Sequence, residues 1–208
     1  CLLVAALMPL AFTDHYYQPW SLLEPAFYAG ALLSLHRGRL WLAMLLVNVA
    51  TLNRETGIIL GLGLAILLWM LARDTAEFDR SRRFAAMFAA LPIALYIAIR
   101  HALGPSSHIH SLSYFVSYNL QPFNLARAAL HFTLFGGLLG VLLQRGLKSA
   151  SRYERYSLWT VFLYSGSLAV FAQWHEVRPL LSVIPIVLPI ASRYLWQCIA
   201  PSVSEVSQ

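Results

Sequence analysis

The sequence predicts an all-α fold, a polytopic bundle of transmembrane helices, and three observations support this prediction. Of the 208 residues, 59% are hydrophobic and 12% are charged, whereas an average soluble domain is about 25% charged. The mean hydropathy is +0.62. The apolar residues form about eight segments separated by short polar connections, which is typical of a chain that crosses a bilayer repeatedly.

In chain order, the hydrophobic segments are 1–12, 21–36, 40–53, 57–72, 84–103, 124–143, 157–173 and 179–198. Several are shorter than the ~20 residues that a helix needs to cross the hydrocarbon core. The pair 40–53 and 57–72 therefore has two alternatives to a transmembrane hairpin, namely a re-entrant pair or one broken helix. Gly57, Gly61 and Gly63 follow the break and would allow close helix packing.

These segments predict a single transmembrane helical domain over residues 1–198, followed by a polar tail over residues 199–208 that we expect to be frayed. The first residues are apolar and include no initiator methionine, so we expect the N-terminus to be truncated. Cys1 and Cys198 lie at opposite ends of the chain, which does not indicate a disulfide framework.

The basic residues predict the orientation of the bundle. If the chain crosses at every segment, all of its 15 lysines and arginines except Arg54, Arg100, Arg127 and Arg178 fall on one side. Basic loops stay in the cytoplasm, so we expect a multi-pass protein of the inner (plasma) membrane with a cytoplasmic C-terminus. The net charge of +6 then reflects topology, and we expect no nucleic acid partner.

Charged residues also interrupt the apolar sequence at the turn "NRET", Asn53 to Thr56. Arg54 offers a planar donor fork that suits phosphate or carboxylate, and Glu55 would gain from the positive end of the following helix. Free backbone N–H groups at that helix start would also favour an anion. The alternative is that Arg54 and Glu55 simply cap a turn and reach water.

A second charged connection, "QWHEVRPLL" from Gln173 to Leu181, has a similar composition. His175 titrates near neutral pH and would serve as a proton carrier, although an interfacial histidine is often only solvated. Glu176 and Arg178 would pair with the charges of the "NRET" turn, and the alternative is that this pairing is purely structural. We therefore count Asn53, Arg54 and Glu55, with His175, Glu176 and Arg178, as candidate binding residues.

Carboxylates near the first outer connection are the candidate catalytic groups. Asp14 lies among aromatic residues in "FTDHYYQPW", and Glu24 precedes Pro25 near the start of the next helix. Such carboxylates would act as a general base or as an orienting group. The alternative for Asp14 is a surface residue in an aromatic belt.

The connection 104–123 is long and rich in aromatic residues, so we expect an interfacial helix or partly ordered segment that covers the outer pocket. His108 and His110 would face the same way in an extended segment, but no third metal ligand is visible. No cofactor is evident from the sequence, and whether a divalent metal binds is left open. Arg127 and His131 share a helix face, where Arg127 would hold a lipid phosphate or snorkel.

The motifs "NRET" and "HEVR", with the proline-spaced segment "RPLLSVIPIVLPI", give the chain a family resemblance over about residues 14–195. The chain resembles bacterial GT-C-type membrane glycosyltransferases, multi-helix enzymes that transfer sugars from a polyprenyl-phosphate carrier. An acidic pair in the first outer loop, a feature of that family, is absent here. The resemblance implies that Asp14 or Glu24 activates an acceptor hydroxyl. It also implies that Arg54, Arg178 and Arg127 hold the lipid-linked phosphate.

The predicted function is therefore an integral membrane protein of the glycosyltransferase-like class that handles a lipid-linked phosphate sugar at the outer face. Its predicted partners are the lipid bilayer and a polyprenyl-phosphate-linked sugar. Two alternatives remain, a transporter or flippase subunit and a non-catalytic structural subunit of a membrane assembly. An internal repeat would favour the transporter, and none is evident in the sequence.

Overall fold

A computed structural model of the protein describes residues 23–73, 78–104, 112–171 and 182–199, and within these ranges the chain is helical without strands. The all-α class is therefore confirmed. The elements are α2 (Leu23–His36), α3 (Leu40–Asn53), α4 (Gly57–Ala72), α5 (Phe78–Leu103), α6 (Leu112–Asn119), α7 (Pro122–His131), the π-helix η2 (Phe132–Gly137), α8 (Leu138–Gly146), the 3-10 turn η3 (Leu147–Ser149), α9 (Arg152–Phe171) and α10 (Ile184–Ile199).

The number of membrane-spanning helices is smaller than the sequence predicted. By length and composition, one helix among the described residues is able to cross a membrane, the 25-residue stretch Asp79–Leu103, whose most apolar window has a mean hydropathy of 1.7. The helices α2 and α3 have 14 residues each, which at 1.5 Å per residue gives ~21 Å against a hydrocarbon core of ~30 Å. The prediction of about eight spans is therefore wrong for the described residues.

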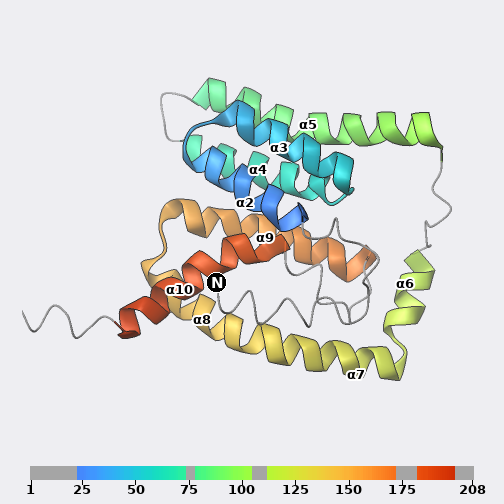
Figure 1. Ribbon diagram of the computed structural model, residues 1–208, viewed down its shortest axis with the longest axis vertical. Coiled ribbons are helices and arrows are strands. Elements are labelled where there is room, and N and C mark those ends of the chain that lie inside the picture. Colours follow the sequence, from blue (N-terminus) through green and yellow to red (C-terminus); the bar gives the residue numbers. More distant parts are fainter. Residues whose placement is uncertain (1–22, 74–77, 105–111, 172–181, 200–208) are drawn as a thin grey trace, which may run out of the picture.

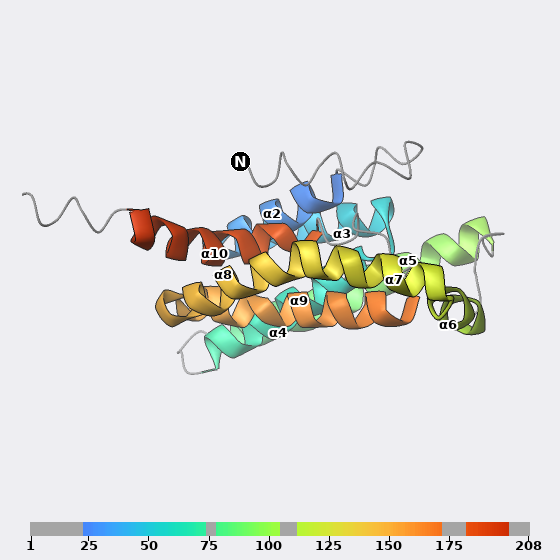
Figure 2. The same cartoon turned by 90° about the horizontal axis from the view of Figure 1, so that it is seen from below.

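The helices run back and forth along one axis, and this direction determines which ends lie together (Figure 1). The α2–α3 turn, the start of α5, the α8–α9 turn and the end of α10 lie at one end of the bundle, which we call the arginine-rich end. The α3–α4 turn, the end of α5 and α6 lie at the other end, which we call the turn end (Figures 1 and 2). Chain segments far apart in sequence therefore meet at each end.

The turn between α3 and α4 is a true hairpin, as the alternation of basic loops indicates. Arg54 has φ −156° and ψ 147°, so the chain leaves the helical conformation directly after Asn53. The helix resumes at Gly57, and α3 packs against α4. The single broken helix proposed as an alternative is therefore excluded.

Two glycines of α4 allow the close packing that the sequence predicted. A Cβ atom at Gly61 would meet the Phe88 carbonyl oxygen and the Pro92 ring of α5. A Cβ atom at Gly63 would meet the Thr160 side chain of α9. The helix α4 therefore approaches both α5 and α9 closely, as small residues at helix interfaces permit.

The core lies between α2, α3, α4, α5 and α9. Its fully buried large side chains come from these five helices and include Tyr28, Val47, Leu60, Leu64, Leu67, Phe88 and Tyr164. The helix α9 lies between the helices α2 to α5 on one side and the consecutive helices α7, η2 and α8 on the other (Figure 1). It contacts α2 at two places, because the Tyr153 hydroxyl donates to the Leu32 carbonyl at 2.6 Å and Tyr164 packs on Tyr28.

Candidate functional site: a buried carboxylate at the turn end

A buried carboxylate organises the turn end of the bundle. Glu24, in the first turn of α2, is 2% exposed. Its Oε2 atom lies 3.4 Å from Nη1 of Arg54. Its Oε1 atom accepts hydrogen bonds from the Thr56 hydroxyl and from the Tyr164 hydroxyl, the latter at 3.2 Å. Both carboxylate oxygens therefore have donors.

Local structure explains why these donors meet. Arg54 ends α3 in an extended conformation, and Thr56 begins α4 without capping its own helix. The Thr56 hydroxyl is therefore available to Glu24. Tyr28 lies four residues after Glu24, so the two side chains lie on the same face of α2. The Tyr28 hydroxyl donates to the Thr56 carbonyl at 3.0 Å. The turn is thus bound to α2 at two points.

Aromatic contact completes the cluster from the side of α9. The rings of Tyr28 and Tyr164 meet edge to face with centroids 5.7 Å apart, an arrangement that aromatic pairs favour. The hydroxyl of Tyr164 extends past this contact to the carboxylate of Glu24. The cluster therefore joins α2, the α3–α4 turn and α9.

The ion pair is buried unequally on its two sides. The Glu24 side chain is 3% exposed, whereas the Arg54 side chain is 26% exposed. A buried charge is costly unless it is paired and hydrogen-bonded, and Arg54 supplies the countercharge for Glu24. Only Nη1 of the guanidinium contacts Glu24. Arg54 is thus fixed on one side and accessible on the other.

The backbone at the start of α4 differs from the expected anion site. The N–H groups of Gly57, Ile58 and Ile59 donate to the carbonyls of Arg54, Glu55 and Thr56, each at 3.0 Å. These three donors are already satisfied by the tight turn, and so they are not free to hold an anion. The group that this turn offers to an anion is the side chain of Arg54, which lies beside the exposed Glu55.

The remaining candidate residues differ in position. Asn53 is half-buried at the end of α3, and Glu55 is exposed in the same turn. Arg127 is half-buried on α7, which lies along the opposite edge of the molecule from the α3–α4 hairpin (Figure 1). The structure therefore brings Glu24 and Arg54 together and leaves Arg127 apart. Four further candidates lie outside the described residues: Asp14, His175, Glu176 and Arg178.

Sequence reasoning missed three members of the cluster. Tyr28 had a usable signal, because it follows Glu24 by one helical turn. Thr56 belongs to the "NRET" motif but was not given a role. Tyr164 is separated from Glu24 by 140 residues, and nothing in the surrounding apolar sequence marks it.

No group of three or more histidine, cysteine, aspartate or glutamate side chains gathers as a metal site within the part of the chain that the structure describes. The pair His108 and His110 lies outside that part. In the connection 104–123, the described helix α6 packs against α7 and α9. A helix in this connection is thus confirmed, and its covering role stays a prediction.

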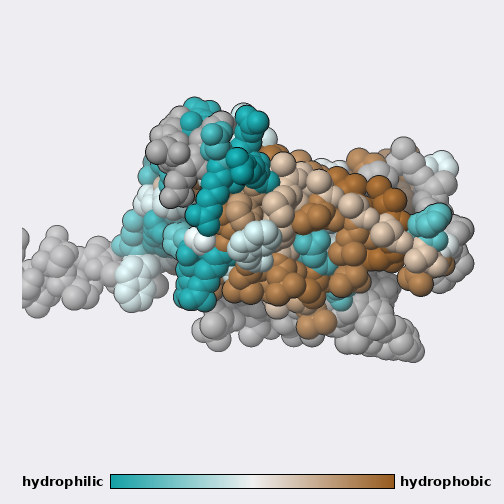
Figure 3. All heavy atoms as spheres, turned by 90° about the horizontal axis from the view of Figure 1, so that it is seen from above, coloured by the Kyte–Doolittle hydropathy of each residue, from teal (hydrophilic) through white to brown (hydrophobic). Residues whose placement is uncertain are grey.

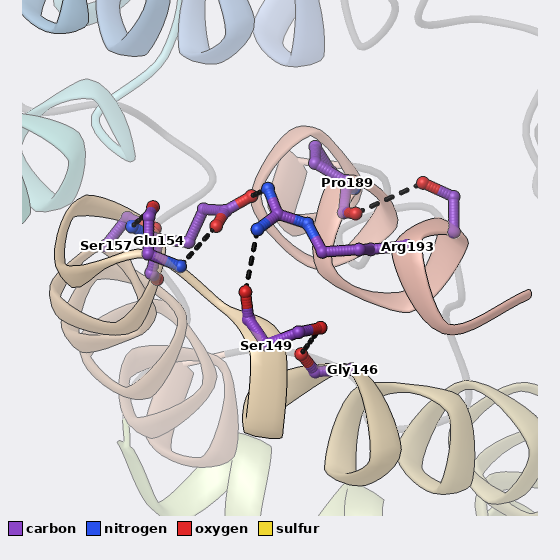
Figure 4. Close-up of polar contacts among 8 residues, drawn as sticks. Gly146, Ser149, Glu154, Ser157, Pro189 and Arg193 are labelled. Carbon is purple, nitrogen blue, oxygen red and sulfur yellow. Dashed lines mark hydrogen bonds and ion pairs between the residues drawn. The ribbon is translucent and has the colours of Figure 1, made fainter. Parts of the chain in front are cut away.

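A second polar cluster joins α8, α9 and α10 at the arginine-rich end (Figure 4). Arg193 of α10 donates at 2.7 Å to the Ser149 carbonyl and to Oε1 of Glu154. The Ser151 N–H donates to the Glu154 carboxylate at 2.7 Å, and the Glu154 N–H donates to the Ser151 hydroxyl at 3.2 Å. This reciprocal pair is a capping box that starts α9, and Arg193 fixes it to α10.

Comparison with protein families, with curated proteins and with solved structures finds no match for this chain.

Proposed function

We propose that this chain is an integral membrane protein in which α5 crosses the bilayer and the shorter apolar helices are embedded beside it. The observation that carries this proposal is the number of large apolar side chains exposed along the helices. Examples come from five helices and are Trp41 at 65%, Trp69 at 49%, Ile97 at 60%, Phe162 at 66% and Trp196 at 70%. Figure 3 displays a broad hydrophobic face that ends at a hydrophilic region.

Lipid is the environment that suits such a surface. Monomeric soluble proteins rarely expose contiguous apolar patches larger than a few hundred Å². In the most apolar window of α5, 11% of the residues are buried, which differs from the core helix of a soluble protein. Helices shorter than the hydrocarbon core are accommodated by local thinning of the bilayer, so the 14-residue α3 and the 16-residue α4 are compatible with membrane insertion.

Extraction of membranes tests this proposal directly. We expect the protein to stay in the membrane pellet after washing with alkaline carbonate and with high salt, and to enter solution with detergent. Recovery of the folded protein in the soluble fraction without detergent would contradict the proposal. Ile97→Arg, which places a charge on the exposed face of α5, should reduce membrane recovery, whereas Arg100→Gln near the helix end should not.

We further propose, as a second function, that the turn end binds the phosphate of a lipid-linked sugar, as a glycosyltransferase-like protein would. This proposal is supported by the unequal burial of the ion pair, since Arg54 is anchored by Glu24 and remains 26% exposed. An arginine fork matches phosphate oxygens. Glu24 is enclosed by its donors and acts here as the residue that positions Arg54. The base that activates an acceptor is then assigned to Asp14.

Binding of a polyprenyl-phosphate probe separates this function from its alternatives. Arg54→Lys keeps the charge but loses the planar fork, so it should weaken binding of the probe while the amount of folded protein stays constant. Arg100→Lys, at the same end of the bundle and stacked on Tyr96 at 5.2 Å, is the matched control and should bind normally. Equal binding by wild type and Arg54→Lys would favour a structural subunit.

A further inference from the structure

Exposed arginines from two separate segments meet at the arginine-rich end. Arg80, Arg82 and Arg83 are exposed in the first two turns of α5. Arg37 and Arg39 are exposed in the turn between α2 and α3. We call these five residues the arginine surface.

A ring contact places the two segments side by side. Trp41 in the first turn of α3 meets Phe84 of α5 edge to face, with ring centroids 5.0 Å apart. Phe84 directly follows Arg83, and Trp41 is two residues from Arg39. The helices α3 and α5 also pack against each other. The arginines of both segments therefore belong to one surface.

Among the described residues, no ion pair neutralises the arginine surface. Across the described parts of the chain, the ion pairs are Arg54 with Glu24 and Arg193 with Glu154, and none involves the five arginines. Asp79 is the acidic neighbour on α5, and it is exposed. Within the described part of the chain, five cations therefore lie beside one carboxylate, and such an excess of positive charge attracts an anionic partner.

The surroundings of the arginine surface indicate what kind of anion it meets. Trp41 is 65% exposed, and tryptophan is enriched where the headgroups of a membrane begin. The apolar part of α5 follows Phe84 directly, so the arginines at the start of α5 lie next to apolar sequence. Figure 3 shows that a hydrophilic region borders the broad hydrophobic face. A cationic patch next to an apolar span and an exposed tryptophan has the order of groups found at a lipid headgroup layer.

We propose that the arginine surface binds anionic phospholipid headgroups of the leaflet at this end of the bundle. This inference rests on the proposed membrane location and adds a lipid preference to it. The arginines supply planar donors for headgroup phosphates, and Trp41 anchors the same edge in the interface.

Short-chain phosphatidylglycerol is the probe that tests this inference on the detergent-solubilised full chain. Phosphatidylglycerol should raise the melting temperature, and the zwitterionic phosphatidylcholine of equal chain length should not. The triple variant Arg80→Gln, Arg82→Gln, Arg83→Gln should lower the affinity for phosphatidylglycerol by on the order of 100-fold. Equal stabilisation by both lipids would overturn the inference.

A matched control distinguishes an effect of the net charge from an effect of the location of the charges. Arg145, Lys148 and Arg155 are exposed at the same end on α8, η3 and α9, and their triple glutamine variant removes the same charge. It should retain the response to phosphatidylglycerol. Equal loss in both triple variants would overturn the assignment to this surface. The double variant Arg37→Gln, Arg39→Gln alters a turn and leaves α5 intact. It should lose part of the affinity for phosphatidylglycerol.

Two further measurements separate the possible failures. Inorganic phosphate should not reproduce the rise in melting temperature, and an equal rise would identify a soluble anion as the ligand and overturn the lipid assignment. Insertion into pure phosphatidylcholine vesicles with no response to phosphatidylglycerol would overturn this inference and leave the membrane proposal intact. Absence of insertion into either vesicle would contradict the membrane proposal itself.

Discussion

Glu24 is a buried carboxylate whose donors come from a turn and from a distant helix. Arg54 and Thr56 belong to the α3–α4 turn, and Tyr164 belongs to α9. Because the carboxylate has both charge compensation and hydrogen bonds, its burial is tolerated. The loss of one partner is more costly than the net value of the pair, since the other charge stays buried.

The first prediction concerns this asymmetry between Glu24 and Arg54. Glu24→Gln keeps the shape but removes the charge, and it should lower the free energy of unfolding by about 1–3 kcal/mol. Arg54→Gln should cost more, because it leaves the carboxylate of Glu24 buried without a countercharge. Thermal and denaturant unfolding in detergent measures both. Glu55→Gln, in the same turn but exposed, is the control and should change stability by less than ~0.5 kcal/mol.

A double-mutant cycle checks the coupling. If the two residues act as a pair, the variant that carries both substitutions should be less destabilised than the sum of the single variants. Additive effects would show that Glu24 and Arg54 act independently.

The second prediction concerns the hydroxyl of Tyr164. Tyr164→Phe keeps the ring contact with Tyr28 and removes the donor to Glu24, which retains Arg54 and Thr56. We expect a loss of about 0.5–1.5 kcal/mol in unfolding free energy. Tyr194→Phe, at a half-buried site on α10, is the control and should have a smaller effect. A larger loss for the control than for Tyr164→Phe would contradict the proposed hydrogen bond.

At the scale of the elements, the positions of the helices were predictable, and a change of helix type within one apolar segment was not. Apolar segments flanked by polar residues marked the α3–α4 hairpin to within a residue, and Gly61 and Gly63 marked its close packing. The segment 124–143 was predicted as one helix, whereas a π-helical turn at Phe132–Gly137 divides it. Hydropathy follows composition alone, so it does not reveal where backbone hydrogen bonding changes within an apolar segment.

The candidate site, too, was predictable from the sequence only in part. Glu24 and Arg54 were predictable because isolated charges in apolar sequence need partners. Their pairing with each other was not, because Arg54 was assigned to a partner in the connection 173–178. Tyr164 required the packing of α9 on α2, a contact between segments far apart in sequence that no local pattern encodes.

The third prediction tests the contact between α4 and α9. Gly63→Ala would place a methyl group against Thr160, and overpacking of this kind costs ~1–3 kcal/mol. Gly166→Ala on α9 is the matched control, because a Cβ atom there meets nothing within 4 Å. It should stabilise the helix by about 0.5–1 kcal/mol. Unfolding midpoints of both variants supply the measurement, and stabilisation by both would contradict the close approach.

A compensating substitution distinguishes contact from propensity. Thr160→Ala removes the atoms that the added methyl would meet, so the double variant with Gly63→Ala should recover part of the lost stability. Failure of Thr160→Ala to relieve Gly63→Ala would locate the strain elsewhere on α4.

At the scale of the whole molecule, the charge pattern of the sequence and the direction of the helices agree. The exposed arginines of the α2–α3 turn and of the start of α5 lie at one end of the bundle, whereas Arg54 and Arg100 lie at the other (Figure 1). Alternating helices alone would produce two ends but not a difference in charge between them. Such a difference is expected where basic loops are retained in the cytoplasm, and it predicts the orientation of the proposed membrane protein.

The last prediction tests this orientation in cells. In a background with Cys1 and Cys198 replaced by serine, Glu55→Cys and Arg80→Cys place single thiols at the turn end and at the arginine-rich end. Both positions are exposed, so accessibility depends on the side of the membrane. A membrane-impermeant maleimide should label position 55 in intact cells and position 80 only after permeabilisation, because arginine-rich connections remain cytoplasmic. Labelling of position 80 with protection of position 55 would show that the topology is the reverse of the predicted one. Labelling of both positions in intact cells would show that the bilayer does not separate the two ends.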